Sequence, residues 1–267
     1  MRIGSPAPTF HRYVRVDDRF ELPTGNSMKT DYDGHFVLEI SAGGSGVLNV
    51  YTGTSVHGDF MIRNLSTFAP ITQIGSGTTI YGSLGCEGEE LYVAGASIIA
   101  TDSHYGAALF TSNGNGDSLL QLRRTPAITI GATQKAAIVS YGTNGHAARM
   151  TMSGVDFTLN PINAIGSRPT AVCYSPLASA RLSFLAAGGT SIVTGLVYVS
   201  GGSKHTPSAF AGHVTFDDAS EIRGVLVANG TVYLGTHGRV TYDPTPFKTS
   251  PYGSIFQGFY GGRRVYL

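Results

Sequence analysis

The sequence predicts an all-β protein made of many short antiparallel strands, with few or no helices. Short apolar runs such as Phe60-Met61-Ile62 and Leu91-Tyr92-Val93 recur at intervals of roughly 8 to 12 residues, the spacing of consecutive short strands. Glycine supplies 36 of the 267 residues, about twice its usual share of roughly 7%, and it stands between the runs, where tight turns demand positive φ. The pair Asn144-Gly145 and the segment Asn113–Asp117 carry hairpin-turn signals.

Residues 1–40 differ in composition from the rest of the chain. They hold a large share of its charged side chains, and Pro6, Pro8 and Pro23 disfavour helix there. We expect this segment to be an N-terminal docking arm or small module. The equally weighted alternative is that it supplies the first strands of the main domain.

Residues 41–160 are the expected β-rich body. From the end of the first segment onward, strands are expected at Phe36–Leu38, Val47–Leu48, Phe60–Ile62, Thr79–Tyr81, Leu91–Val93, Ile98–Ile99, Ala108–Phe110, Leu119–Leu122, Ile128–Ile130, Ala137–Val139, Met150–Met152 and Phe157–Leu159. The connections between these runs are too short to contain crossover helices, which argues against a βαβ fold.

Residues 161–267 are the expected second β-rich module, with an aromatic and glycine-rich C-terminal tail. Leu177–Ala187 is the best helical candidate, although its alternation also fits a strand. Val225–Leu234 is the clearest predicted hairpin, because Asn229-Gly230 interrupts two β-rich runs. The tail after Pro244 suits a segment lying on a neighbouring subunit, or equally a coil that covers its own core.

The arrangement of these strands stays open at the level of sequence. A β-sandwich or jelly-roll-like module fits the short runs, and a short β-solenoid is the alternative. A solenoid would repeat at roughly 20 residues or more, and no residue recurs at a fixed offset along this chain.

The charge balance favours a subunit of an assembly. Charged residues make up 13% of the chain and the net charge is +1, against a usual charged share of about 25%, so the surface suits contact with copies or partners. The alternative is a neutral β protein whose surface consists of hydroxyls and amides. The pairs Arg123-Arg124 and Arg263-Arg264 are too short for nucleic-acid binding. No apolar run approaches the roughly 18 residues of a membrane span, and from the first residues we expect no secretory signal.

Two acidic clusters are the candidates for paired-carboxylate chemistry. They are Asp217, Asp218 and Glu221, and Glu87, Glu89 and Glu90. Each lies in a turn-like stretch beside strands, and adjacent residues of a strand point to opposite faces. We expect both clusters to be solvated polar turns, and therefore predict no catalytic residue.

Other residue types give no stronger signal. The segment Thr101–His104 holds the residue types of a catalytic triad, but their adjacency favours a loop. Asn113–Asp117 has oxygen ligands for calcium, but a plain turn is favoured. The eight histidines lack metal-ligand spacing. Cys86 and Cys173 are expected to be buried free thiols rather than a disulfide. We predict no cofactor and no metal.

The chain resembles bacteriophage virion proteins in its short strands rich in Gly, Ser and Thr, its low charge and its aromatic tail interrupted by proline. The stretches Ile74–Gly82 and Ala127–Gly131 are similar to the stalks of tail fibres and tailspikes. The resemblance implies a virion structural subunit that forms a homotrimer, attaches through its N-terminal segment and contacts other virion proteins or a host surface glycan. Capsid decoration or coat proteins share this composition and are the alternative, followed by a polysaccharide-cleaving tailspike and a glycan-binding module.

Overall fold

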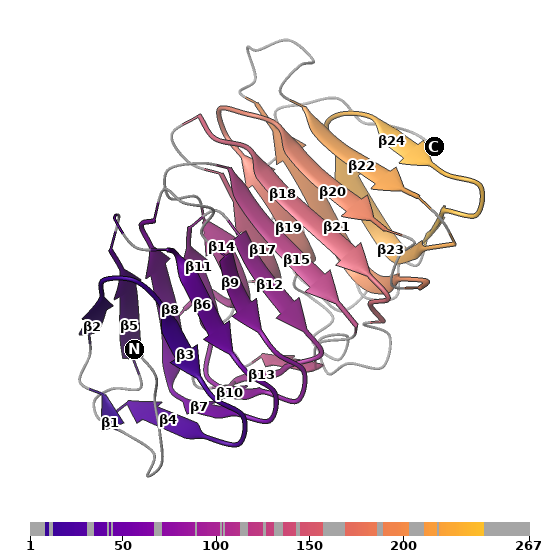
Figure 1. Ribbon diagram of the computed structural model, residues 1–267. Helices are drawn as coiled ribbons and strands as arrows, with labels where there is room; N and C mark the ends of the chain where they lie inside the picture. The colour runs from indigo at the N-terminus through magenta and orange to yellow at the C-terminus, as the bar shows by residue number, and fades with distance from the viewer. Residues whose placement is uncertain are drawn as a thin grey trace.

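The computed structural model shows a parallel β-solenoid without a helix among the residues that it describes. These residues are 9–242, except for 11–12, 31–34, 42, 44, 67–70, 89, 102, 104, 113–116, 125–126, 131–135, 143–144, 157–168, 186–188, 203–210 and 218. The chain winds from one end of a stack to the other, so that the colour in Figure 1 runs continuously along it. The all-β prediction is therefore confirmed.

Three parallel sheets form the sides of the stack, and each coil of the chain adds strands to them in turn. Sheet B contains β1 (Thr9–Phe10), β4 (Ser27–Thr30), β7 (Ser55–His57), β10 (Thr79–Tyr81), β13 (Ser97–Ala100) and β16 (Ala127–Ile130). Sheet C contains β2 (Tyr13–Val16), β5 (His35–Ile40), β8 (Asp59–Asn64), β11 (Leu84–Glu87), β14 (Ala107–Ser112), β17 (Ala136–Tyr141), β19 (Pro169–Ser175), β21 (Ile192–Gly201), β23 (Glu221–Ala228) and β25 (Arg239–Tyr242). Sheet A contains β3 (Phe20–Leu22), β6 (Val47–Val50), β9 (Ile71–Ile74), β12 (Glu90–Ala94), β15 (Ser118–Arg123), β18 (Ala148–Ser153), β20 (Ala180–Phe184), β22 (Gly212–Phe216) and β24 (Val232–Leu234).

The antiparallel arrangement expected from the sequence is wrong, because every strand pairing of the described residues is parallel. Parallel neighbours need a crossover connection, and here strands of the other two sheets provide it. The solenoid alternative is therefore correct, and the sandwich and jelly-roll alternatives are not.

Two local predictions are corrected for the same reason. Val225–Leu234 is not a hairpin, because β23 pairs with β21 and β25 in sheet C while β24 pairs with β22 in sheet A. The helical candidate Leu177–Ala187 contains strand β20, which lies between β18 and β22. In both cases the partner strand belongs to a neighbouring coil, which local turn signals do not reveal.

Coil length varies along the stack. Ile80 pairs with Ile98, 18 positions later, whereas Ser140 pairs with Cys173, 33 positions later. This variation explains why no fixed sequence period is visible. Sheet B ends at β16 in the described part, and the later coils add strands to sheets C and A alone. Both sheets continue across residue 160, through the pairs β17–β19 and β18–β20.

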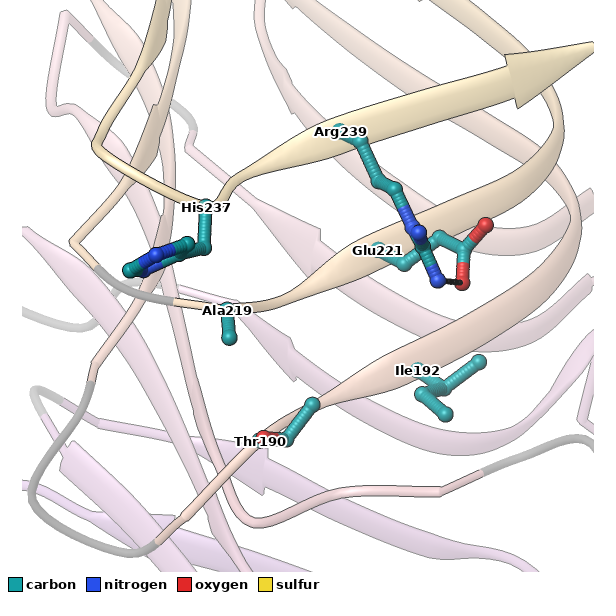
Figure 2. Close-up of a pocket in the computed structure, with 6 residues that line it drawn as sticks. All are labelled: Thr190, Ile192, Ala219, Glu221, His237 and Arg239. Atoms are coloured by element: carbon teal, nitrogen blue, oxygen red, sulfur yellow. Dashed lines mark hydrogen bonds and ion pairs between the residues drawn. The ribbon is translucent and has the colours of Figure 1, made fainter.

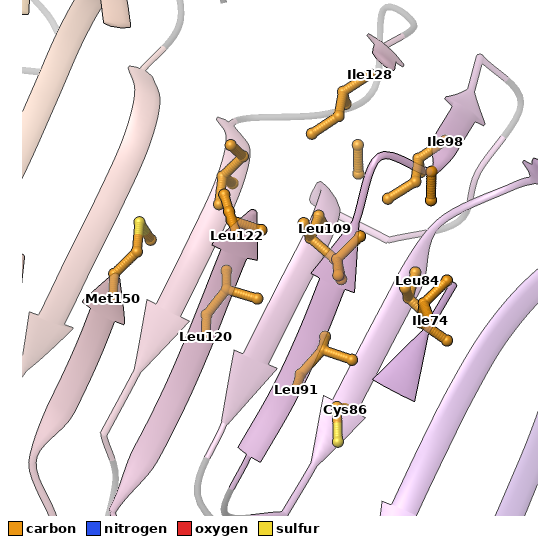
Figure 3. Packing of buried hydrophobic residues seen from close by; sticks show 14 of the residues in the cluster. Ile74, Leu84, Cys86, Leu91, Ile98, Leu109, Leu120, Leu122, Ile128 and Met150 are labelled. Carbon is orange, nitrogen blue, oxygen red and sulfur yellow. The ribbon is translucent and has the colours of Figure 1, made fainter. Parts of the chain in front are cut away.

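The core is a continuous apolar column inside the stack. Leu91, Leu109 and Ile98 come from sheets A, C and B respectively, and all three are fully buried. Figure 3 shows such side chains converging on the interior between the sheets. Full burial of each aliphatic side chain stabilises the fold by about 1.5–3 kcal/mol. Because the inner faces are occupied in this way, any site for a partner must lie on the outer faces, at the corners or at the ends.

Candidate functional site

The outer face of sheet C carries an unusual row of apolar residues. One outward residue per strand forms it, and we call the row the apolar column: Tyr13, Val37, Met61, Gly85, Phe110, Val139, Val172, Tyr198 and Val227. Every side chain of this row is partly or well exposed to solvent, apart from Gly85, which has none to expose. Monomeric soluble proteins rarely expose contiguous apolar patches larger than roughly a few hundred Å², and patches above that size mark interaction sites.

A charged ladder runs beside the N-terminal half of the apolar column. Arg15, Glu39, Arg63 and Glu87 occupy in-register positions on β2, β5, β8 and β11. Glu39 lies 3.9 Å from Arg15 and 3.8 Å from Arg63, and Arg63 Nε donates to Glu87 Oε2 over 3.0 Å. The charges alternate in sign, so each is balanced by its neighbours within the chain and the ladder leaves little net charge on this face.

In the C-terminal half of sheet C, the outer face carries tyrosines instead of the charged ladder. Tyr141 and Tyr174 are in-register neighbours whose ring centroids are 5.7 Å apart, and Tyr198 follows at 6.5 Å from Tyr174. Burial, followed by the neighbouring hydroxyls of Tyr198 and Tyr141, raises the pKa of Tyr174. These rings extend the apolar surface, and tyrosine combines an aromatic ring with a polar hydroxyl, a combination common at protein interfaces.

A shallow pocket lies near the C-terminal end of sheet C (Figure 2). It has a volume of about 400 Å³ and is lined by Thr190, Ile192, Ala219, Glu221, His237 and Arg239. Glu221 is the first residue of β23, and Arg239 is its in-register neighbour on β25. The side chain of Glu221 is 6% exposed, which makes it the most buried carboxylate of the predicted acidic clusters among the described residues.

Three side chains donate hydrogen bonds to the carboxylate of Glu221. Thr241 Oγ1 donates to Oε1 over 2.6 Å, and Arg223 Nε and Arg239 Nη2 donate to Oε2 over 2.8 and 3.0 Å. Desolvation alone would raise the pKa of Glu221, but the hydrogen bonds from Thr241, Arg223 and Arg239 outweigh it, so the pKa is lowered. A general acid needs a raised pKa, and this carboxylate is instead held ionised. The arrangement is that of a structural ion-pair cluster.

The structure separates the residues of the predicted acidic clusters. Asp217 is exposed at the end of β22, and Asp218 lies outside the described residues. Glu87 belongs to the charged ladder of sheet C, whereas Glu90 lies on sheet A and accepts a hydrogen bond of 2.6 Å from Gln121. Glu89 lies outside the described residues. Within each cluster the described carboxylates therefore belong to different sheets: Glu87 to sheet C and Glu90 to sheet A, Glu221 to sheet C and Asp217 to the end of a strand of sheet A.

The remaining candidates are also engaged in structure or lie outside the described part. Ser103 is buried and bonds to the Ser83 hydroxyl, while Asp102 and His104 fall outside the described residues. Asp117 accepts from the Ala147 amide and pairs with Arg149. The other residues of the turn, 113–116, are outside the described part, as is the tail after residue 242.

The two thiols lie in the core of the solenoid. Cys86 and Cys173 are free and buried, as predicted. Burial raises the pKa of each thiol to about 12, which leaves neither reactive as a nucleophile. No three His, Cys, Asp or Glu side chains in the described ranges are close enough to hold a metal ion.

Comparison with known proteins identified no relative of this chain. No family model, no curated protein and no solved structure matches this chain. The described residues contain no helix long and apolar enough to cross a membrane.

The geometry itself offers the outer face of sheet C as the candidate site. The sequence did not predict this face, because neighbouring residues of its apolar column are about 24 to 33 positions apart along the chain.

Proposed function

We propose that this protein is a structural subunit of a bacteriophage particle, of the tail fibre or spike type, which forms a homo-oligomer and serves attachment. The apolar column on sheet C carries the proposal. A parallel solenoid is a stiff, extended body, since every coil is hydrogen-bonded to the next. A fold of this kind is compatible with spike proteins, and the resemblance in composition and strand pattern favours the same class.

The size of the whole outer face of sheet C suits a subunit contact. Nine strands at a spacing of about 4.8 Å span about 40 Å. Strands of about six residues make this face, with its apolar column, charged ladder and tyrosines, about 20 Å wide, which gives on the order of 800 Å². A standard interface buries about that area on each partner. The sparse charge of the chain supports the same conclusion, because weak self-repulsion favours association.

A second copy of this chain is the proposed occupant of the face. The charged ladder is neutralised within the chain, so the ladder itself offers no net charge to attract a strongly charged partner. Apolar side chains flanked by neutralised ones match a surface of the same kind. A homotrimer is the state that the spike resemblance implies, and other virion proteins would contact the oligomer elsewhere.

Two alternatives to a spike-type subunit predict different observations. A capsid decoration subunit would stay monomeric in solution and associate with a lattice. A polysaccharide-cleaving tailspike would need a carboxylate free to donate a proton, and the ion-paired state of Glu221 argues against that role. We therefore propose a non-enzymatic subunit that needs no cofactor.

The native mass in solution tests the proposal. Light scattering coupled to gel filtration should show a discrete oligomer of the 28.0 kDa chain, and a trimer is expected. The double variant V139K/V172K should dissociate it, because each lysine would have to be buried in the contact. The matched control T151K/S183K changes outward residues of sheet A, on β18 and β20, and should keep the oligomer.

A monomer at all concentrations would overturn the proposed self-association and favour the decoration alternative. An oligomer that persists in V139K/V172K would show that sheet C is not the contact. Circular dichroism of each variant establishes that the β fold is retained, so that a change in mass reports on association.

A further inference from the structure

The outer face of sheet A has a different chemistry from that of sheet C. The seven strands from β6 to β22 each contribute one outward residue to what we call the polar column: Asn49, Gln73, Tyr92, Gln121, Thr151, Ser183 and Thr215. The same register continues to Glu21 on β3, at the end of the row far from Arg181, and to Tyr233 on β24. All seven carry hydroxyl or amide groups and none is charged. A protein surface is usually about 25–35% charged, so seven consecutive uncharged hydrogen-bonding residues are a distinct feature of this face.

Most of these groups have no hydrogen-bond partner among the residues that the structure describes. In the part of the chain that the structure describes, Gln121 donates to Glu90, and the side chains of the other six make no hydrogen bond. They sit at a strand spacing of about 4.8 Å, so their donors and acceptors form a regular row about 30 Å long. A linear, hydroxyl-rich molecule could bond to several of them at once.

A second outward row adds positive charge to one half of this face. Arg149, Arg181 and His213 are in-register neighbours on β18, β20 and β22. Asp117 pairs with Arg149, whereas Arg181 is exposed and has no ionic partner among the described residues. Like charges directly opposite each other on adjacent strands are destabilising, so the row gains from an anion placed beside Arg181.

His213 extends the row in a defined way. Its Nδ1 accepts a hydrogen bond of 3.2 Å from the Thr231 amide. The neutral ring therefore carries its proton on Nε2 and can donate it to an oxygen acceptor. Beside these three side chains, on the same strands, lie Thr151, Ser183 and Thr215, which supply hydroxyls at matching heights.

We propose that this face binds an extended acidic polysaccharide, with a sugar carboxylate at Arg181 and sugar hydroxyls along the polar column. The idea rests on the proposed attachment function and names the chemical class of its receptor. Nucleic acid is a poorer match, because its binding requires many cations along a phosphate backbone and only Arg181 is unneutralised in this row. A protein partner is a poorer match as well, because the polar column offers one aromatic ring, Tyr92, among six aliphatic polar side chains.

Binding of defined polysaccharides tests the inference on the full-length chain. Polygalacturonate, a linear chain of carboxylated sugars, and dextran, a neutral one, are titrated by calorimetry. We expect polygalacturonate to bind and dextran to bind at least about tenfold more weakly, since a charge-assisted hydrogen bond is lost. Arg181→Gln should weaken polygalacturonate binding by about tenfold, and the double variant T151A/S183A should weaken it further.

Arg123→Gln is the matched control. Arg123 is an exposed arginine on β15 of the same sheet, on the opposite side of the polar column from the row of Arg149 and Arg181. Its variant should bind like the unaltered chain. Equal loss in Arg123→Gln and Arg181→Gln would show unspecific charge attraction and overturn the inference, as would equal binding of dextran or no binding of polygalacturonate.

The native mass of each sample separates this inference from the proposed function. An intact oligomer that fails to bind polygalacturonate overturns the glycan site alone. A monomer that binds polygalacturonate in an Arg181-dependent way supports the glycan site and overturns the proposed self-association.

Discussion

Gly224 lies against the carbonyl of Gly195, its in-register neighbour on the preceding coil. A Cβ at position 224 would stand 2.1 Å from the Gly195 oxygen, closer than any real contact. Both residues also adopt positive φ, 145° and 117°. The two coils can stack here because neither position has a side chain, and the same close approach supports the strands that carry the Glu221 cluster.

Gly224→Ala should therefore destabilise the protein by about 1–3 kcal/mol, through backbone strain and displacement of the neighbouring coil. Urea unfolding followed by circular dichroism measures the change. Gly106→Ala is the control, because a Cβ there meets no atom within 4 Å. Equal stabilities of the two variants would contradict the stacking argument.

The ion-pair cluster at Glu221 predicts a pH-dependent contribution to stability. Glu221→Gln should lower the free energy of unfolding at pH 7 by about 1–3 kcal/mol, because it removes charge-assisted hydrogen bonds. The pKa of Glu221 is lowered in the folded state, so its stabilising effect is present above the unfolded pKa of about 4.3. That effect is lost as the pH falls through the folded pKa.

Denaturant unfolding at pH 7 and at about pH 3 measures this difference between the unaltered chain and the variant, which should shrink in acid. Glu90→Gln serves as the comparison, since Glu90 has one neutral partner on an outer face. A gap that widens on acidification would refute the assigned sign.

The two thiols should be unreactive until the protein unfolds. With a pKa of about 12 for both Cys86 and Cys173, only about one part in ten thousand is thiolate at pH 8, and the thiolate is the reacting form. Ellman's reagent should detect no thiol in native protein within minutes and two in denaturant. Prompt reaction of the native chain would mean that the coils open far more readily than their burial suggests.

The charged ladder predicts that the order of its charges matters. Arg63→Glu would place three carboxylates on consecutive strands, beside Glu39 and Glu87, and should destabilise the fold by about 1 kcal/mol. The loss should be smaller in 1 M NaCl, where the screening length is about 3 Å. Thermal unfolding in low and high salt checks this, with Arg123→Glu on sheet A as the unpaired comparison.

The local character of most segments could be predicted from the sequence. The runs Phe60–Ile62, Leu91–Val93 and Ile128–Ile130 all lie in strands, because β-branched and aromatic residues favour extended backbone wherever the strand pairs. The buried thiols were also predictable, since a small apolar side chain without a CxxC neighbour prefers the core. These properties depend on the residue itself and its immediate neighbours.

The pairing of the strands was not predictable, and Val225–Leu234 shows why. A turn signal at Asn229-Gly230 is local, but the partner of β23 begins 29 residues earlier, at Ile192. Alternation of buried and exposed residues is the same in parallel and antiparallel sheets, so periodicity could not separate the two. A constant repeat length would have indicated a solenoid, but the coils differ in length from 18 to 33 residues.

The sequence by itself therefore determined that this chain is extended, apolar within and sparsely charged, because composition and local propensity act on every residue separately. Only the tertiary structure decided which residues share a face. Tyr13, Phe110 and Val227 become one apolar column, and Arg149, Arg181 and His213 one row, since hydrogen bonding between coils brings together residues that lie far apart along the chain.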